Sequence, residues 1–322
     1  MKAGKAIYVE KPVSHNPREG EILVEAAAKH KAVFQMGNQR RSSAVYQSAI
    51  KEIRAGVIGE PRFGRCWYAT ARAPIGKGVE APPPQWLDWD LWQGPAPRRP
   101  FRDNVVHYNW HWFHHWGTGE CGNNATHYVD VARWALGVTF PSRVTCGGGR
   151  LFSEGDDWEW YDTQAATFEF PGRKFMTWEG LSSAKARPYE GASTGCMIYG
   201  LEGAVLFTPD NVCTLFDKAG KKVREWNAKD VAADATNRTN PTGGLDSAHL
   251  ANWVACVRGR DVRTPTPAAE AHASTLLTHL ANIAQRTGET VRVDPATGGL
   301  AKGSAGSEFW AREYEPGWAM TV

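Results

Sequence analysis

The feature that most limits how this chain can fold is a series of short runs in which apolar and polar residues alternate, between positions 143 and 217. A period of two places successive side chains on opposite faces of a strand. Turn pairs such as Pro171-Gly172 and Glu202-Gly203 separate several runs, which favours hairpins. We therefore expect a large, mostly antiparallel sheet. Its expected strands are Arg143–Phe152, Thr163–Phe170, Lys174–Leu181, Cys196–Gly200, Ala204–Thr208 and Cys213–Asp217.

The N-terminal part of the chain follows a different pattern. Ala6–Val9 and Ala32–Met36 are apolar runs typical of buried strands, and a helical spacing begins at Asn16-Pro17 between them. Strand, helix and strand in this order predict a β-α-β unit with parallel strands. Because both faces of a parallel sheet must be covered, such a sheet is rarely built from two strands. We therefore expect its other strands to lie upstream.

The remaining segments complete the expected fold. Helical periodicity marks Ser42–Ala55, Asn124–Leu136, Ser247–Val257 and Ala268–Arg286, and further strands are expected at Arg62–Ala71 and Val291–Val293. The segment 74–119 is rich in proline and lacks periodic runs, which indicates a long functional loop or lid. The fold class is therefore α/β: the end of a parallel sheet, then an α+β domain with a large, mostly antiparallel open sheet and helices on one face.

Composition narrows the classes of partner. The net charge is only +3, which provides no strong field for nucleic acid or anionic lipid. No run is long and apolar enough to predict a membrane span. The six cysteines are scattered without a C-x-x-C pair, which disfavours a zinc site or a dithiol centre. We expect a folded protein that binds neither nucleic acid nor membrane.

A first candidate site is Glu10-Lys11-Pro12, which ends the first expected strand. Ligands of open parallel sheets bind at the carboxyl ends of the strands. The proline favours an extended backbone at Lys11, which directs that side chain beyond the strand. The ammonium group could hold a hydroxyl or ribose oxygen there; by position alone, a surface lysine is the alternative interpretation.

A second candidate site is the helix that follows the glycine-rich segment Gly117–Gly122. His127 lies near the start of this helix, and Asn123 and Asp130 fall on the same stripe at helical spacing. A neutral imidazole accepts a proton near pH 7 when a neighbour fixes its tautomer. Packing is the alternative role for such a histidine. The glycines fit the spacing G-x-G-x-x-G, but no buried strand precedes them, so we do not predict a dinucleotide loop there.

Histidines and tryptophans crowd the region before that helix. Five of the ten histidines lie between positions 107 and 127, which raises the question of a metal site. The segment around Trp110, His111 and Trp112 is interleaved with aromatic residues and lacks nearby cysteine. We therefore predict no metal. An aromatic cradle for a substrate and simple packing both remain open.

Taken together, these motifs resemble the Gfo/Idh/MocA oxidoreductases, a family named after glucose–fructose oxidoreductase and inositol dehydrogenase. The resemblance extends over nearly the whole chain. The motifs that carry it are Glu10-Lys11-Pro12, Gly37-Asn38-Gln39-Arg40-Arg41, His127-x-x-Asp130-x-x-Arg133-Trp134, His249-x-x-Asn252-Trp253 and Gly288 after the last long helix.

The resemblance implies a fold, a cofactor and roles for residues. It implies an N-terminal Rossmann domain for NAD or NADP, with Lys11 at the substrate and the nicotinamide ribose and His127 as catalytic base. Asn123 and Asp130 are expected to support the histidine. The residues expected at the cofactor are Glu10, Lys11, Pro12, Asn38, Gln39 and Arg40, and those expected at the substrate are Trp110, His111, Trp112 and Asn124.

Two departures from the family pattern lead to further expectations. The phosphate-binding loop normally precedes the Glu-Lys-Pro motif, and only nine residues precede Glu10 here. We therefore expect residues 1–41 to be the end of the Rossmann domain and 42–322 the substrate and oligomerisation domain. Asn123 also stands where many members carry an aspartate beside the histidine. An amide orients an imidazole but does not stabilise its cation as a carboxylate does.

Three functions follow as hypotheses. The first is an NAD(P)-dependent oxidoreductase acting on a sugar, glycoside or polyol. The second is a hydrolase or lyase that oxidises a sugar transiently with bound NAD. The third is a non-catalytic oligomerisation or carbohydrate-binding module. The resemblance also implies a homo-oligomer, dimer or tetramer, formed through the C-terminal sheet. We expect a cytoplasmic protein, with the periplasm as the alternative.

Overall fold

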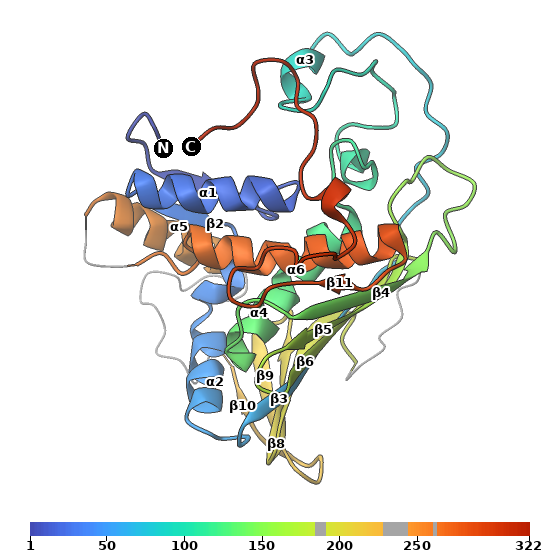
Figure 1. Cartoon of the computed structure of the whole chain (residues 1–322). Helices are drawn as coiled ribbons and strands as arrows, with labels where there is room; N and C mark the ends of the chain where they lie inside the picture. Colours follow the sequence, from blue (N-terminus) through green and yellow to red (C-terminus); the bar gives the residue numbers. More distant parts are fainter. Residues whose placement is uncertain (184–190, 228–243, 260–262) are drawn as a thin grey trace.

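The computed structural model describes residues 1–183, 191–227, 244–259 and 263–322. Its centre is a nine-stranded sheet with the order β10-β9-β8-β7-β3-β6-β5-β4-β11 (Figure 1). The strands are β3 (Pro61–Ala69), β4 (Arg143–Gly149), β5 (Thr163–Phe170), β6 (Lys174–Leu181), β7 (Thr194–Gly200), β8 (Gly203–Thr208), β9 (Val212–Asp217), β10 (Lys222–Trp226) and β11 (Val291–Arg292). The predicted large, mostly antiparallel sheet is confirmed.

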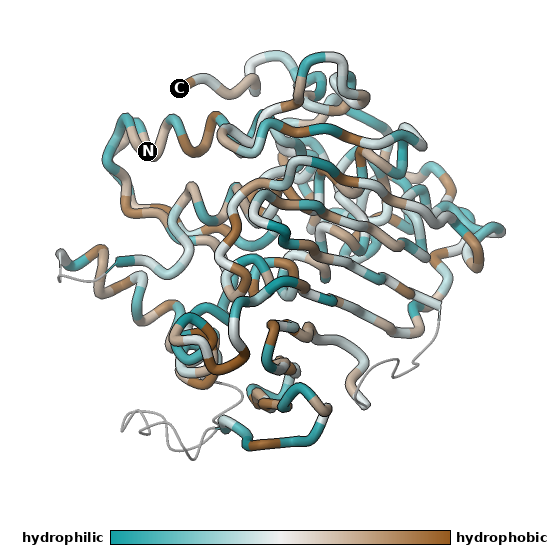
Figure 2. The backbone as a smooth tube through the Cα atoms, turned by 60° about the horizontal axis from the view of Figure 1, so that its bottom comes forward, coloured by the Kyte–Doolittle hydropathy of each residue, from teal (hydrophilic) through white to brown (hydrophobic). Residues whose placement is uncertain are grey.

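β3 joins the two halves of this sheet. It pairs in parallel with β6, with Phe63 opposite Phe175, and antiparallel with β7, with Cys66 opposite Cys196. On one side β6, β5 and β4 form antiparallel hairpins, and on the other side β7 to β10 form a meander. Hydrophobic and hydrophilic residues are interleaved along these strands (Figure 2). One parallel contact therefore sits in the middle of an antiparallel sheet.

Two details of the sheet differ from the expectation. The strand expected at Arg143–Phe152 ends at Gly149, because the backbone N–H groups of Leu151, Phe152 and Ser153 donate to the carboxylate of Asp162 instead of a neighbouring strand. The strand β10 was not predicted. Its exposed residues do not alternate as those of a half-buried strand do.

Helices cover one face of the sheet (Figure 1). The helices of the chain are α1 (Pro17–Lys29), α2 (Ala44–Arg54), the short α3 (Trp89–Trp92), α4 (Thr126–Leu136), α5 (Gly244–Val257) and α6 (Ala268–Thr287). Gly64 of β3 lets α4 approach closely, since a Cβ there would lie 3.3 Å from the side chains of Ala132 and Leu136. The main hydrophobic core lies between the sheet and this layer, with Trp178, Phe168 and Tyr46 among its fully buried side chains.

The N-terminal unit forms a second, smaller core. β1 (Ile7–Val9) and β2 (Phe34–Met36) pair in parallel, and α1 connects them, as predicted. Asn16 caps α1 by accepting a hydrogen bond from the Glu19 N–H, which satisfies one of the free donors of the first turn. Phe34 and Met36 pack against Ala268 and Ala271 of α6, which holds the unit to the rest of the molecule. Within the described ranges, no helix is both long and apolar enough to span a membrane.

Candidate active site

The parallel pairing of β1 and β2 brings two sequence motifs together at one sheet edge. Val9 lies opposite Met36, and the Gly37 N–H donates to the Val9 carbonyl at 2.8 Å. The Glu10 side chain crosses Gly37 so closely that a Cβ at Gly37 would lie 2.6 Å from its carboxylate oxygen. Glu10-Lys11-Pro12 therefore lies beside the segment 37–41.

Lys11 is held by the segment that leads into α4. Its Nζ donates to the backbone carbonyl of Asn123 at 2.6 Å and to Oδ1 of the same residue at 2.7 Å. Burial lowers the pKa of Lys11, while the carboxylates of Glu120 and Glu10 act in the opposite direction. A desolvated ammonium group thus sits at the carboxyl end of β1, in a fixed position.

Glu120 completes this arrangement and was not predicted from the sequence. Only 4% of it is exposed, and its carboxylate accepts from Nδ2 of Asn123 at 3.1 Å and from Nδ2 of Asn124 at 2.8 Å. Arg72 at the end of β3 pairs with it at 3.1 Å. Burial raises the pKa of Glu120, and Arg72 opposes that rise. No pattern in the sequence marks a single buried glutamate whose partners are two neighbouring amides and one distant arginine.

His127 is the second residue of α4 and lies near the same cations. Its Nδ1 is buried, with no hydrogen-bond partner among the described residues. Burial lowers its pKa well below the usual value, and the positive charges of Lys11 and Arg40 lower it further. The imidazole is therefore neutral near pH 7 and has a free lone pair to accept a proton.

The structure does not place Asn123 or Asp130 as partners of His127. The side chain of Asn123 is occupied by Lys11 and Glu120. Residues Cys121–Ala125 form a π-helical turn, whose wider spacing breaks the i, i+4 relation expected between Asn123 and His127. The stripe that the sequence suggests is therefore interrupted where α4 begins.

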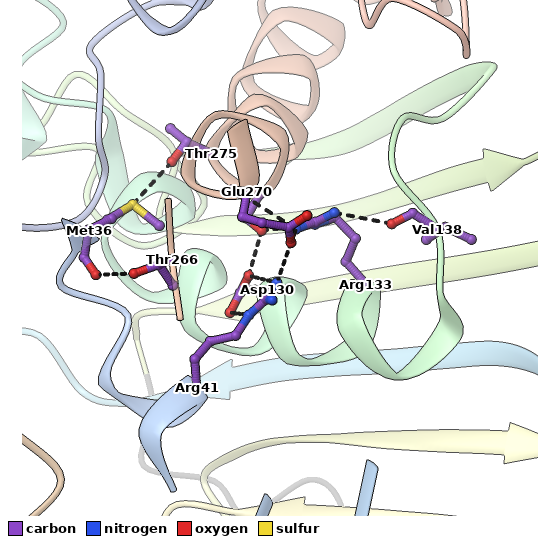
Figure 3. Close-up of polar contacts among 9 residues, drawn as sticks. Met36, Arg41, Asp130, Arg133, Val138, Thr266, Glu270 and Thr275 are labelled. Carbon is purple, nitrogen blue, oxygen red and sulfur yellow. Dashed lines mark hydrogen bonds and ion pairs between the residues drawn. The ribbon is translucent and has the colours of Figure 1, made fainter. Parts of the chain in front are cut away.

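Asp130 instead belongs to a buried ion network (Figure 3). Arg41 donates to both of its carboxylate oxygens, at 2.9 and 2.7 Å, and the Ser274 hydroxyl donates to one of them at 2.6 Å. Glu270 links Arg41 to Arg133, and Arg133 also donates to the Val138 carbonyl (Figure 3). This network ties the segment after β2 to α4 and α6, so Asp130 has a structural position.

Three of the residues expected at the cofactor have buried polar atoms without a hydrogen-bond partner among the described residues. The buried atoms without a partner among the described residues include both side-chain polar atoms of Asn38, Oε1 of Gln39 and Nε of Arg40. The Arg40 guanidinium lies 4.4 Å from the ring centre of Tyr128. Native proteins rarely leave buried polar groups unpaired. These atoms therefore mark the segment 38–40 as a candidate binding surface.

The aromatic residues expected at the substrate differ in how far their rings are exposed. Trp112 is 1% exposed and stacks on Trp158 with 3.7 Å between ring centres, so it has no free face for a sugar and that expectation is wrong. His111 is buried, with Nε2 at 3.9 Å from the Glu120 carboxylate, and burial lowers its pKa to about 4. Trp110 is 37% exposed and retains an accessible ring.

The glycine-rich segment before α4 serves close packing. A Cβ at Gly117 would lie 2.2 Å from the His111 backbone, and one at Gly119 would lie 2.8 Å from the Trp160 ring.

The described part of the chain holds no cluster of three or more histidine, cysteine, aspartate or glutamate side chains suited to a metal ion.

Comparison with known proteins gives this arrangement a context. The chain is similar over 75 residues to inositol 2-dehydrogenase 3 of Saccharopolyspora erythraea, at 33% identity, which covers 23% of this chain and 22% of that protein. Its fold resembles aldose-aldose oxidoreductase from Caulobacter crescentus complexed with glycerol, with a TM-score of 0.63 at 16% identity, covering 91% of this chain and 73% of the other. It also resembles levoglucosan dehydrogenase in complex with NADH and levoglucosan, with a TM-score of 0.65 at 18% identity, covering 90% and 74%.

A family match extends over more of the chain than the curated relative does. The model of the C-terminal α/β domain of the Gfo/Idh/MocA oxidoreductases matches residues 93–293. These residues include α4 and its histidine, eight strands of the large sheet from β4 to β11, and α6. Because the match spans more than half of the chain, this protein belongs to the Gfo/Idh/MocA oxidoreductase family.

Proposed function

We propose that the protein is an NAD(P)-dependent oxidoreductase that acts on a hydroxyl group of a sugar, glycoside or polyol. The observation that carries this proposal is the buried Lys11 ammonium beside a neutral His127 with an unpaired ring nitrogen. Oxidation of a carbinol needs one group to hold the oxygen and another to take its proton. These two side chains supply both.

The roles of the residues follow from their positions. A nicotinamide ring, when bound, supplies the hydride acceptor. Lys11 hydrogen-bonds the substrate oxygen and favours its developing negative charge. His127 accepts the hydroxyl proton. Asn123 positions Lys11 through its carbonyl and its Oδ1, and Glu120 orients the amide of Asn123.

The described residues can accommodate one end of the cofactor. Glu10, Lys11 and Pro12 would border the nicotinamide ribose together with the free polar atoms of the segment 38–40. Pyrophosphate in this kind of fold is held by a glycine-rich turn between a strand and a helix. The described ranges contain no such turn. We propose that residues 1–41 belong to the dinucleotide-binding domain and 42–322 to the substrate domain.

The substrate and the assembly are part of the same proposal. The names of the similar proteins refer to inositol, aldose and levoglucosan, which supports a sugar or polyol substrate. Trp110 and Asn124 are the residues that remain available to contact it, with His111 behind them. The sheet carries a ladder of aromatic rings, with Phe63 at 5.4 Å from Tyr199 and 5.8 Å from Phe175 between ring centres. Such a surface suits a dimer or tetramer formed through the sheet.

The test uses the protein as its gene encodes it. Sugars and polyols, including myo-inositol and levoglucosan, are incubated with NAD⁺ or NADP⁺, and formation of NADH or NADPH is followed by absorbance. The proposal expects reduction of one cofactor with at least one substrate, lost in His127→Ala. Release of an aglycone from a glycoside without net NADH would instead favour the hydrolase hypothesis. Sugar binding without either reaction would favour a non-catalytic module.

A further inference from the structure

Two cavities adjoin beneath the C-terminal segment, away from the Lys11 and His127 side chains. The first has a volume of about 500 Å³ and is lined by His15, His114, Arg286 and Arg312, among others. The second has a volume of about 390 Å³ and is lined on one side by the rings of three tryptophans. His15 and Arg312 line both, so the two cavities adjoin, and together they are called the groove here. The catalytic candidates Lys11, Glu120, Asn123 and His127 line neither.

The first cavity, here called the arginine cavity, is rich in positive charge. Four guanidinium groups line it, against the two carboxylates of Glu308 and Glu313. The lining guanidinium groups are those of Arg98, Arg99, Arg286 and Arg312. Small-molecule sites of this size typically fix a ligand through a few charged or polar groups.

Two of these arginines have no ion-pair partner among the described residues, namely Arg99 and Arg286. Glu159 and Glu308 act on Arg286 from beyond ion-pair distance. Arg286 is instead fixed by aromatic rings, with its guanidinium 3.8 Å from the centre of the Phe309 ring and 5.7 Å from that of Trp160. A guanidinium held flat in this way keeps its N–H edge available for an oxyanion.

The groove also collects buried polar atoms without partners. Those in its lining are Nδ1 of His15, Nε2 of Gln93, Nε2 of His114 and Nε1 of Trp116. Gln93 is only 3% exposed, so its amide donor has little access to bulk water. The positive charge of Arg312 lowers the pKa of His15, and that of Arg286 lowers the pKa of His114, after the larger effect of burial. Both shifts agree with a positive potential in the arginine cavity.

The second cavity supplies apolar surface next to the charges. Trp92, Trp110 and Trp116 line it. Flat aromatic rings suit the apolar faces of a sugar, and the unpaired indole N–H of Trp116 can donate to a hydroxyl. The groove thus combines a ring-binding half and an oxyanion-binding half in two adjoining cavities.

We infer that this groove binds a sugar that carries an oxyanion, with the phosphate, sulfate or carboxylate in the arginine cavity and the ring against the tryptophans. The groove shares Trp110 with the proposed substrate site, but Lys11, Glu120, Asn123 and His127 do not line it, and binding there does not depend on the proposed reaction. The guanidinium groups of Arg99 and Arg286 recognise the anion, and the unpaired donors of Gln93 and Trp116 recognise the hydroxyls. An uncharged sugar does not make the contacts with the guanidinium groups, and a free anion does not make the contacts with Gln93 and Trp116.

The test is calorimetric titration of the 322-residue chain without NAD(P). The probes are glucose 6-phosphate, glucuronate, a sulfated glucose, glucose and inorganic phosphate. We expect at least one of the three anionic sugars to bind with a submillimolar Kd. Glucose and inorganic phosphate should each bind at least about tenfold more weakly, because each makes only part of the contacts.

Variants assign the binding to the groove. Arg99→Gln and Arg286→Gln should each weaken binding of the anionic sugar by about tenfold, as expected for loss of a charge-assisted hydrogen bond. Arg143→Gln is the matched control, because Arg143 is an exposed arginine on the sheet that pairs with Glu169. Arg143→Gln removes one positive charge, as Arg99→Gln and Arg286→Gln do, and should leave the Kd of the anionic sugar unchanged. Circular dichroism spectra of all three variants check that the fold is kept.

Three outcomes would overturn the inference. One is that none of the anionic sugars binds with a submillimolar Kd. Another is that inorganic phosphate binds as tightly as the anionic sugar, which would make the ligand a free anion. The third is that Arg143→Gln weakens binding as much as Arg286→Gln, which would show attraction by net charge alone. Loss of enzyme activity plays no part in this test, so failure of the proposed reaction leaves it intact.

Discussion

Lys11 and His127 show how one environment prepares two groups for different tasks. Burial lowers the pKa of both. For Lys11, the nearby carboxylates of Glu120 and Glu10 favour the charged form that can hold an oxygen. For His127, the nearby cations favour the neutral form that can take a proton. The surroundings therefore favour a charged Lys11 and a neutral His127.

Removing either side chain should abolish most of the turnover. We expect His127→Ala and Lys11→Ala each to lower kcat of the protein as its gene encodes it by about 10²–10⁴-fold, the usual effect of losing a general base or an equivalent polar group. Thermal unfolding should show little change. Near wild-type kcat in His127→Ala would remove this residue as the base. His30→Ala is a suitable control, since His30 ends α1 and takes no part in the site.

The pH dependence should report the neutral state of His127. Its lowered pKa places the acidic limb of kcat/KM below the usual histidine value of about 6.5. In Asn123→Asp a carboxylate is added beside Lys11, which favours imidazolium and should move this limb to higher pH. The measurement is a pH profile of kcat/KM for both proteins. An unchanged limb would show that position 123 does not act on the histidine through charge.

Sequence reasoning identified Lys11 and His127 but not their surroundings. A lysine before proline at a strand end and a histidine after a glycine-rich lead are local patterns, so a reader of the sequence can find them. Glu120 became buried only because distant Arg72 and neighbouring amides converge on it. The partner of Asn123 was mispredicted, since a π-helical turn leaves no clear trace in the sequence.

At the scale of elements, the ion network around Asp130 connects three segments distant in sequence. Arg41 comes from the segment after β2, Asp130 and Arg133 from α4, and Glu270 and Ser274 from α6. A buried charge left without its partner is costly, by about 3–5 kcal/mol. The network therefore makes the N-terminal unit and the helical layer dependent on each other.

Breaking this network should destabilise the whole chain. We expect Arg41→Met to lower the free energy of unfolding by about 3–5 kcal/mol, because Asp130 is then buried without its main partner. Arg143→Met removes an exposed arginine that pairs with Glu169 and should cost at most about 1 kcal/mol. Urea denaturation of both variants measures the difference. Equal, small effects would mean that water or other residues replace Arg41.

The same network predicts a response to acid. Burial opposes ionisation of Asp130, but Arg41, Arg133 and Ser274 hold its pKa below the usual value. A depressed carboxylate pKa contributes stability that is present above the unfolded-state pKa of about 3.9 and is lost as pH falls through the folded-state pKa. The acid loss of stability below about pH 4 should therefore be smaller in Asp130→Asn than in wild type. Urea titrations between neutral and acidic pH test this.

Regular elements were predictable to the extent that their own residues determine them. The alternating runs gave β5 and β6 because each has one buried face, whereas β8 and β9 were found from short apolar runs that are buried at consecutive residues. β10 escaped prediction because it is mostly exposed, and its place at the sheet edge depends on pairing with β9. The parallel pairing of β3 with β6 was also not predictable, since no local pattern specifies which distant strands become neighbours.

At the scale of the whole molecule, the described residues offer only part of a dinucleotide site. We expect the 322-residue chain to bind NAD⁺ and NADP⁺ weakly, with a Kd above the micromolar range. Lys11 and the segment 37–41 can contact the nicotinamide end, whereas pyrophosphate binding depends on a glycine-rich turn and a helix N-terminus. Calorimetric titration tests this, with myo-inositol and levoglucosan as parallel probes of the substrate side. Micromolar affinity would mean that the phosphate groups bind elsewhere in the chain.

The central position of β3 has a consequence for how the protein is made. β3 leaves the ribosome more than a hundred residues before β6 and β7, the two strands that pair with its edges. At about 5–20 residues per second, both edges of this largely apolar strand stay open for roughly 5 to 20 seconds or longer. Pulse-labelled hydrogen exchange during refolding should show β3 protected only after the hairpins β5–β6 and β7–β8 have formed. The strand that holds the finished sheet together is thus the one most exposed to wrong pairing during synthesis, and we expect chaperones to matter most in that interval.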